Sequence, residues 1–90
     1  MTCEREVKIE NRNGLHARPA AEIVKAAARF RSDITIRRDD MEVNGKSIMG
    51  VLMLVASKGT WVIVKAKGDK AQEAVDAITK LINDKFGEGK

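Results

Sequence analysis

The chain contains one histidine and one proline, which lie three residues apart within the segment from Asn11 to Ala21. Asn13-Gly14 is a pair typical of turns, and Pro19 suits the first turn of a helix. The start of a helix presents unpaired backbone N–H groups and a partial positive charge, which together bind anions. Arg18, two residues after His16, adds planar donors that match phosphate oxygens. The segment therefore predicts an imidazole placed to accept and release a phosphoryl group.

Other kinds of site find little support in the sequence. There is no second histidine and Cys3 is the single cysteine, so we expect neither a transition-metal site nor an internal disulfide. A nucleophile-elbow pattern and a glycine-rich ATP-binding loop are both absent from the sequence. The chemistry that the sequence still supports is phosphoryl relay on a histidine nitrogen. Other proteins would donate and remove the phosphoryl group, and no cofactor or metal would be needed. The alternative is a small basic binding module in which His16 is structural.

Composition limits the class of protein. Ninety residues, of which 43% are hydrophobic and 33% charged, predict a single small domain over residues 1–90. We expect a cytoplasmic protein with no membrane partner, because the sequence has neither an apolar run as long as a membrane span nor a signal-peptide core. The net charge of +4 is modest, and one tryptophan and two phenylalanines are the only aromatic residues. This composition argues against binding of nucleic acid.

Hydrophobic periodicity predicts the elements that position these residues. We expect strands at residues 3–9, 33–37, 41–43 and 60–67, and helices at 19–30, 48–55 and 70–86. A tight hairpin turn at 38–40 favours antiparallel pairing. The order βαββαβα, with the three helices on one face, predicts an α+β fold: an open-faced β-sandwich with a four-stranded antiparallel sheet.

The second predicted helix is short and almost wholly apolar. Ser47 is expected to be its N-cap, and Lys58-Gly59 is expected to stop it. An apolar patch around Met49 and Met53 would then remain, and methionines there either fill gaps in the core or form a surface that binds partners. We favour the partner surface for Met49 and leave Met53 open between the two. The expected inward positions are Ile48, Val51, Leu52 and Val55.

The third predicted helix has a different start signal. Asp69 is expected to cap it, with Gln72 three residues later completing a pair that resembles a capping box. Gly87 is expected to end the helix, and residues 88–90 to form a frayed tail.

Three segments together resemble the HPr family, the histidine-containing phosphocarriers of the bacterial phosphoenolpyruvate:sugar phosphotransferase system. They are Gly14-Leu15-His16-Ala17-Arg18-Pro19-Ala20, Lys46-Ser47-Ile48-Met49-Gly50-Val51 and Lys58-Gly59-Thr60. The resemblance spans essentially the whole chain and includes the predicted order of elements. It implies a monomeric phosphoryl carrier rather than an enzyme with turnover of its own.

The resemblance implies a role for each matched residue. His16 would carry the phosphoryl group on Nδ1 between enzyme I and sugar-specific IIA proteins, and Arg18 would neutralise the phosphate. Ser47 would be the regulatory serine that an ATP-dependent HPr kinase/phosphorylase modifies. Its phosphate would add negative charge beside a surface that meets acidic partners, while the fold is kept. The implied partner-binding positions are Ala17, Ala21, Lys25, Ile48, Met49 and Leu52.

One alternative and one departure accompany the resemblance. A regulatory relative, of the nitrogen or catabolite-control type, would match the same motifs without serving sugar transport, and its partners would include transcriptional regulators. Val55 departs from the family pattern, because many members have glycine or another small residue there. We expect this difference to affect packing near the end of the second helix more than phosphoryl transfer.

Overall fold

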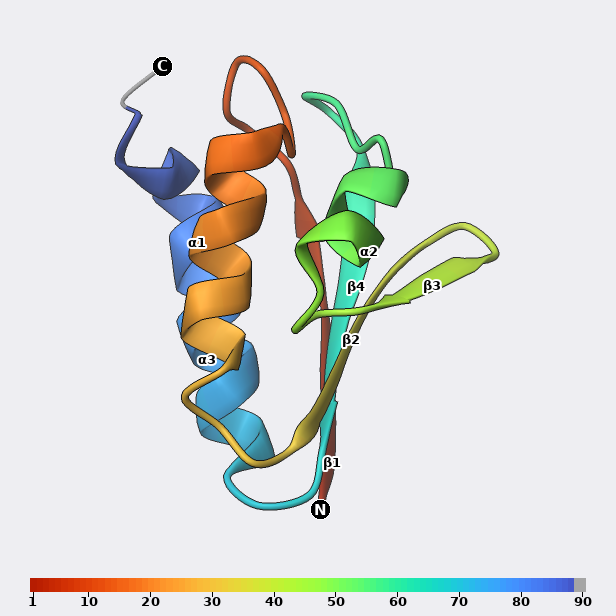
Figure 1. Cartoon of the computed structure of the whole chain (residues 1–90), viewed down its shortest axis with the longest axis vertical. Helices are drawn as coiled ribbons and strands as arrows, with labels where there is room; N and C mark the ends of the chain where they lie inside the picture. Colours follow the sequence, from red (N-terminus) through yellow and green to blue (C-terminus); the bar gives the residue numbers. More distant parts are fainter. Residues whose placement is uncertain (89–90) are drawn as a thin grey trace.

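The computed structural model describes residues 1–88, which form a four-stranded sheet with the helices packed on one face (Figure 1). This arrangement confirms the predicted α+β fold and its order of elements. The elements are β1 (Thr2–Lys8), α1 (Ala17–Ala27), β2 (Asp33–Arg38), β3 (Met41–Asn44), α2 (Ile48–Met53), β4 (Trp61–Lys67) and α3 (Ala71–Asn83), followed by a 3₁₀ helix, Lys85–Gly87. None of the helices in the described part of the chain has the length and apolar character of a membrane span.

The sheet is antiparallel throughout and has the order β1-β4-β2-β3. β4 lies in the middle, so it pairs with both β1 and β2, and Val64 faces Ile36 across the second of these pairs. Alternate residues of β4 are buried against the helices, namely Val62, Val64 and Ala66. β4 therefore follows the period of two that its sequence predicts.

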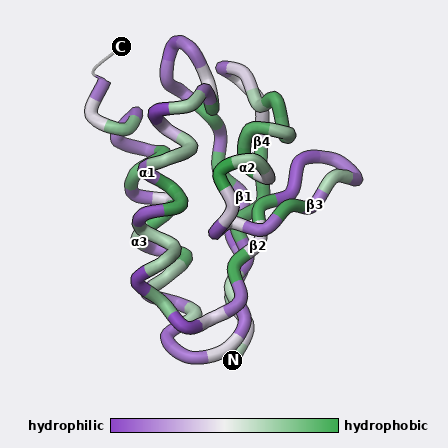
Figure 2. Tube along the Cα trace, in the orientation of Figure 1, coloured by the Kyte–Doolittle hydropathy of each residue, from purple (hydrophilic) through white to green (hydrophobic). Residues whose placement is uncertain are grey.

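The core lies between the sheet and the apolar stripes of α1 and α3. The buried positions recur every three or four residues, as an amphipathic helix requires. On α1 they are Pro19, Ala20, Ile23 and Ala27, and on α3 they include Ala71, Ala74, Val75, Ile78 and Ile82. The hairpin turn between β2 and β3 is hydrophilic, whereas α2 is hydrophobic over most of its length (Figure 2).

One inward position on the edge strand β1 carries a charge. Arg5 forms an ion pair of 2.7 Å with Asp76 and donates a hydrogen bond of 3.0 Å to the Thr79 hydroxyl, both on α3. The Arg5 and Asp76 side chains are 42% and 51% exposed. Solvent screening therefore limits the pair to about 1 kcal/mol or less. The ion pair and the hydrogen bond link the edge strand β1 to α3.

The predicted start and end of α3 are both wrong. Lys70, not Asp69, is the N-cap residue, and its left-handed backbone (φ 55°) comes with no side-chain cap. The Gln72 side chain donates instead to Asp76 Oδ1, at 3.1 Å. The helix ends at Asn83 because the left-handed Phe86 (φ 55°) and its neighbours turn the chain back. Residues 89–90 of the predicted tail lie outside the described residues.

The structure of α2 confirms its predicted start and corrects its end. The Ser47 hydroxyl accepts a hydrogen bond of 3.0 Å from the Gly50 N–H, as expected of an N-cap. The helix stops at Met53, well before Lys58-Gly59, because Val55 has a left-handed backbone (φ 48°). Arg38 fixes this turn, since its Nη1 donates to the carbonyl oxygens of Leu54 and Val55, each at 2.8 Å.

The prediction that four residues of α2 point inward is wrong for two of them. Ile48 is 44% exposed and Val55 is 73% exposed. The early turn at Val55 rotates the chain, so Leu54 is buried beside Val51 in its place. Leu52 is partly buried and packs against the core.

The backbone at Val55 gives a stability prediction. A β-branched residue at positive φ is strained, and glycine relieves that strain. We expect Val55→Gly to raise the free energy of unfolding by about 1 kcal/mol, because the exposed side chain gives up little burial. Val55→Ala is the matched control: alanine shortens the side chain but keeps the strain. Equal gains for both variants in chemical denaturation would contradict backbone strain as the cause.

Candidate functional site

His16 is the N-cap residue of α1. Its backbone is extended (φ −81°, ψ −172°), its carbonyl accepts the Ala20 N–H at 3.0 Å, and its side chain makes no capping hydrogen bond. The N–H groups of Ala17 and Arg18 donate to no described residue, and Pro19 has no N–H to donate. Two backbone donors without a partner among residues 1–88 therefore lie at the helix start beside the imidazole, which is the arrangement that binds oxyanions.

The turn before His16 is packed against the segment that follows α2. Leu15 donates its N–H to the carbonyl of Ala56 at 2.8 Å, and its side chain is buried. Gly14 (φ 66°) makes this approach possible, because a Cβ there would lie 2.4 Å from the Ala56 carbonyl oxygen and 2.8 Å from Ser57 Cα. The position of His16 is therefore tied to the end of α2 through backbone contacts.

A carboxylate lies against the imidazole. Glu88 Oε2 is 3.2 Å from His16 Nε2, and Glu88 Oε1 accepts from Asn11 Nδ2 at 3.3 Å. Asn11 is fully buried and also donates to the carbonyl of Gly14 at 2.8 Å. Neither residue was predicted to contact the imidazole, because Glu88 was expected in a frayed tail and Asn11 was given no role. No pattern around either residue signals the contact, which depends on the turn after α3.

His16 lines a shallow hollow of about 310 Å³. The other residues of this hollow are Asn13, Leu15, Leu52, Val55, Ala56 and Ser57. Of the predicted partner-binding residues, only Leu52 is brought together with His16 here. Ala17, Arg18, Ala21 and Lys25 are exposed on α1.

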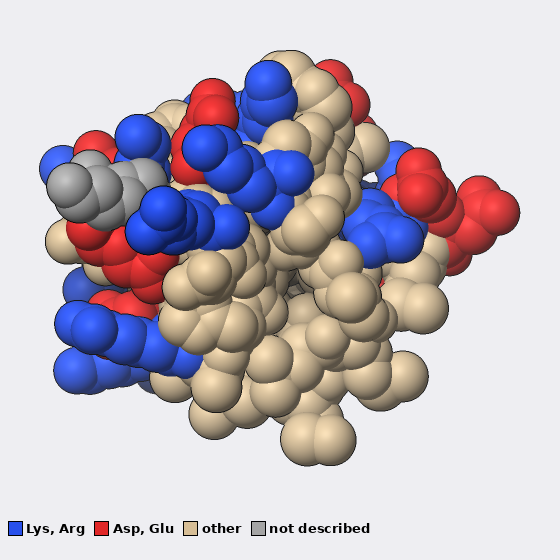
Figure 3. Space-filling view, turned by 90° about the horizontal axis from the view of Figure 1, so that it is seen from above, with Lys and Arg blue, Asp and Glu red and all other residues tan. Residues whose placement is uncertain are grey.

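Most of the remaining predicted positions lie on α2. Ser47 is half-buried at the N-terminus of this helix and does not line the hollow. The exposed apolar residues of this region, which we name the α2 patch, are Ile48, Met49, Met53 and Val55, with Met49 70% exposed. Viewed from the end of the molecule, a wide area free of charged side chains is bordered by Lys and Arg (Figure 3).

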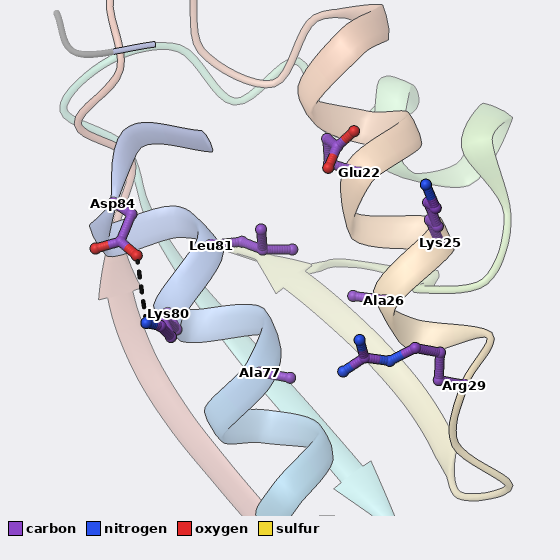
Figure 4. A pocket seen from close by; sticks show the side chains of 8 residues that line it. All are labelled: Glu22, Lys25, Ala26, Arg29, Ala77, Lys80, Leu81 and Asp84. Carbon is purple, nitrogen blue, oxygen red and sulfur yellow. Dashed lines mark ion pairs between the residues drawn. The ribbon is translucent and has the colours of Figure 1, made fainter. Parts of the chain in front are cut away.

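A second hollow, of about 340 Å³, lies between α1 and α3 (Figure 4). Lys25 and Arg29 face it from α1, and Lys80 faces it from α3, where it forms an ion pair of 3.8 Å with Asp84. His16 is not part of this hollow. The structure thus places Lys25 away from the imidazole, in a groove lined by charges of both signs.

A family model described as the phosphorylation site of the HPr component of the phosphotransferase system matches residues 3–84. The chain belongs to the HPr family. Members of this family are phosphocarrier proteins rather than enzymes in the usual sense, which agrees with an imidazole at an anion-binding helix start.

Individual HPr proteins match over nearly their whole length. The phosphocarrier protein HPr of Neisseria meningitidis is 43% identical over 86 residues, covering 96% of this chain and 97% of the relative. That of Pseudomonas putida is 48% identical over 86 residues, covering 94% and 96%. A crystal structure of HPr from Thermoanaerobacter tengcongensis is 46% identical, with a TM-score of 0.92 over 96% of this chain and 97% of that one.

Proposed function

We propose that this protein relays a phosphoryl group through Nδ1 of His16, from phosphorylated enzyme I to IIA proteins of the sugar phosphotransferase system. The observation that carries the proposal is the position of His16 at the N-cap of α1. Its side chain makes no capping bond, and the two N–H groups beside it donate to no residue in the described part of the chain. Such a site holds the oxygens of a phosphoryl group while the ring nitrogen bonds to phosphorus.

Arg18 is the second residue in the proposed chemistry. It lies in the first turn of α1, is exposed, and makes no ion pair with a described residue. Its guanidinium is therefore available to neutralise the oxygens of the transferred group. Positioning for an in-line transfer then comes mainly from the docked partner, because His16 lies in an open hollow rather than a closed pocket.

The surface for the partners is the third part of the proposal. The α2 patch exposes apolar side chains that a partner would cover, which is the usual meaning of such a patch. Ala17, Ala21 and Lys25 would extend this surface along α1, with Ile48, Met49 and Leu52 contributed by α2. The proposal places the protein in the cytoplasm as a monomer that meets one partner at a time.

The test of the proposal uses phosphoenolpyruvate and purified enzyme I. We expect the protein to gain a phosphate that is stable in alkali and lost in acid, as a phosphorus–nitrogen bond requires. Absence of any adduct would refute the phosphocarrier role. An adduct that no IIA protein removes would instead support the alternative of a regulatory relative.

Ser47 is proposed as a regulatory phosphorylation site. Its hydroxyl lies at the start of α2 next to the α2 patch, so a phosphate there would add nearly two negative charges at the partner surface. With ATP and an HPr kinase, we expect an acid-stable adduct that Ser47→Ala does not form. A kinase reaction that leaves the wild-type protein unmodified would contradict this role.

The effect of charge at Ser47 is tested with two variants that both cap the helix. Aspartate and asparagine are good N-cap residues, and they differ by one negative charge. We expect Ser47→Asp to slow phosphorylation by enzyme I about tenfold and Ser47→Asn to leave the rate close to that of the wild type. Equal rates for the two variants would contradict an electrostatic switch.

A further inference from the structure

Glu88 lies beyond residues 3–84, the part of the chain that the family model matches, yet its carboxylate contacts the histidine. We propose that Glu88 is a positioning residue for His16: it accepts the Nε2–H of the ring and thereby leaves the lone pair on Nδ1. The first half of this inference concerns the free protein, and the second half, on transfer, rests on the proposed function.

The carboxylate is held in place from several sides. Its two oxygens have different partners, His16 Nε2 at 3.2 Å and Asn11 Nδ2 at 3.3 Å, and the side chain is only 18% exposed. Asn11 is fully buried and bonded to Gly14, so it is a rigid anchor. A carboxylate fixed at one oxygen has little freedom to leave the ring at the other.

The backbone turn that carries Glu88 is also held in place. Lys85, Phe86 and Gly87 all have positive φ, between 55° and 75°, which turns the chain sharply after α3. Phe86 packs against the core from within this turn, and the Glu88 N–H donates to the Lys85 carbonyl at 2.9 Å. The turn that carries Glu88 is therefore anchored to the core through Phe86.

The contact selects one tautomer of the imidazole. An ionised carboxylate can only accept hydrogen bonds, so the ring nitrogen facing it must carry the proton. In a neutral imidazole the other nitrogen then holds the lone pair, and here that nitrogen is Nδ1. Glu88 therefore prepares Nδ1 as the nucleophile and restricts rotation of the ring.

The same contact acts on the transfer step. The Nδ1 lone pair forms the bond to phosphorus, while the bond between phosphorus and the donor breaks and its electron pair stays on the donor. The proton on Nε2 stays where it is, so the phosphorylated ring acquires a formal positive charge. The adjacent Glu88 carboxylate balances that charge as it develops, as the buried aspartate does in a Ser-His-Asp triad.

The first test measures the tautomer in the unphosphorylated protein. Long-range ¹H–¹⁵N NMR distinguishes a protonated from an unprotonated ring nitrogen, at a pH where the ring is neutral. We expect the wild type to show a protonated Nε2 and an unprotonated Nδ1, and Glu88→Ala to shift both signals toward the average of the two forms. The matched control is Asp84→Ala, which removes an exposed carboxylate near the same turn that pairs with Lys80. Identical His16 signals in the wild type and Glu88→Ala would overturn the proposal.

The second test measures the transfer rate. We expect Glu88→Ala to accept a phosphoryl group from enzyme I about tenfold more slowly, the loss typical of removing the group that orients a histidine. Asp84→Ala should accept it at the wild-type rate, and both variants should unfold at the wild-type temperature. A wild-type rate in Glu88→Ala would overturn the positioning role in transfer. If the wild-type protein accepted no phosphate, the proposed function would fail, while the NMR comparison would still decide whether Glu88 sets the tautomer.

Discussion

Replacing His16 with alanine is expected to abolish phosphate acceptance from enzyme I, the largest functional effect of any single substitution in this chain. His16 is the only histidine, so no second imidazole is available to take its place. The variant should still fold, because the ring is 40% exposed and its only side-chain hydrogen bond within the described structure is with Glu88. The measurement is the acid-labile phosphate bound per protein after incubation with phosphoenolpyruvate and enzyme I.

The control for this variant is a substitution in the same turn that leaves the imidazole intact. Arg12 is exposed there and makes no hydrogen bond or ion pair with a described residue. Arg12→Ala should therefore still gain an acid-labile phosphate. Acid-labile phosphate on His16→Ala would show that another residue is the acceptor.

Replacing Gly14 with alanine is expected to cost the fold about 3 kcal/mol or more. Two effects add: alanine is disfavoured at φ 66°, and its Cβ would lie 2.4 Å from the Ala56 carbonyl oxygen. The atoms that this Cβ would meet, the Ala56 oxygen and Ser57 Cα, are backbone atoms of a packed turn, so relief requires the turn to move. The same movement would displace His16, so we expect slower phosphorylation as well as a lower free energy of unfolding in urea.

Gly59 provides the control that separates these two effects. It also has positive φ (92°), but a Cβ there would meet no atom within 4 Å. Gly59→Ala should therefore cost only the backbone term, about 1 kcal/mol. A loss in Gly14→Ala no larger than that in Gly59→Ala would contradict the close approach between the histidine turn and Ala56.

The fold was predicted well where hydrophobic residues recur with the regular period of a strand or a helix. The alternation of β4 and the helical spacing of α1 report burial directly, and the structure confirms both. The ends of α2 and α3 were harder, because they depend on left-handed residues that are not glycine, such as Val55, Lys70 and Phe86. Two of these conformations are accompanied by tertiary contacts: Arg38 bonds the carbonyls at the end of α2, and Phe86 packs on the core.

The candidate site likewise has one part that local sequence signals predict and another part that they do not. The position of His16 at the start of a helix follows from local signals, namely the Asn13-Gly14 turn and Pro19 in the first helical turn. The Glu88 contact joins residues 72 positions apart, and no local signal encodes such a pairing. Ser47 as a helix cap was predicted from residue type and is confirmed, while its phosphorylation stays a prediction.

The most direct test of the phosphocarrier account is a chase of the isolated phosphorylated protein. The protein is first loaded with labelled phosphate by enzyme I, freed of enzyme I and phosphoenolpyruvate, and then mixed with a IIA protein. We expect the label to leave His16 and appear on the IIA protein, with the unmodified chain regenerated. Label that stays on this chain, or is released only as inorganic phosphate, would contradict its role as a phosphoryl carrier to IIA.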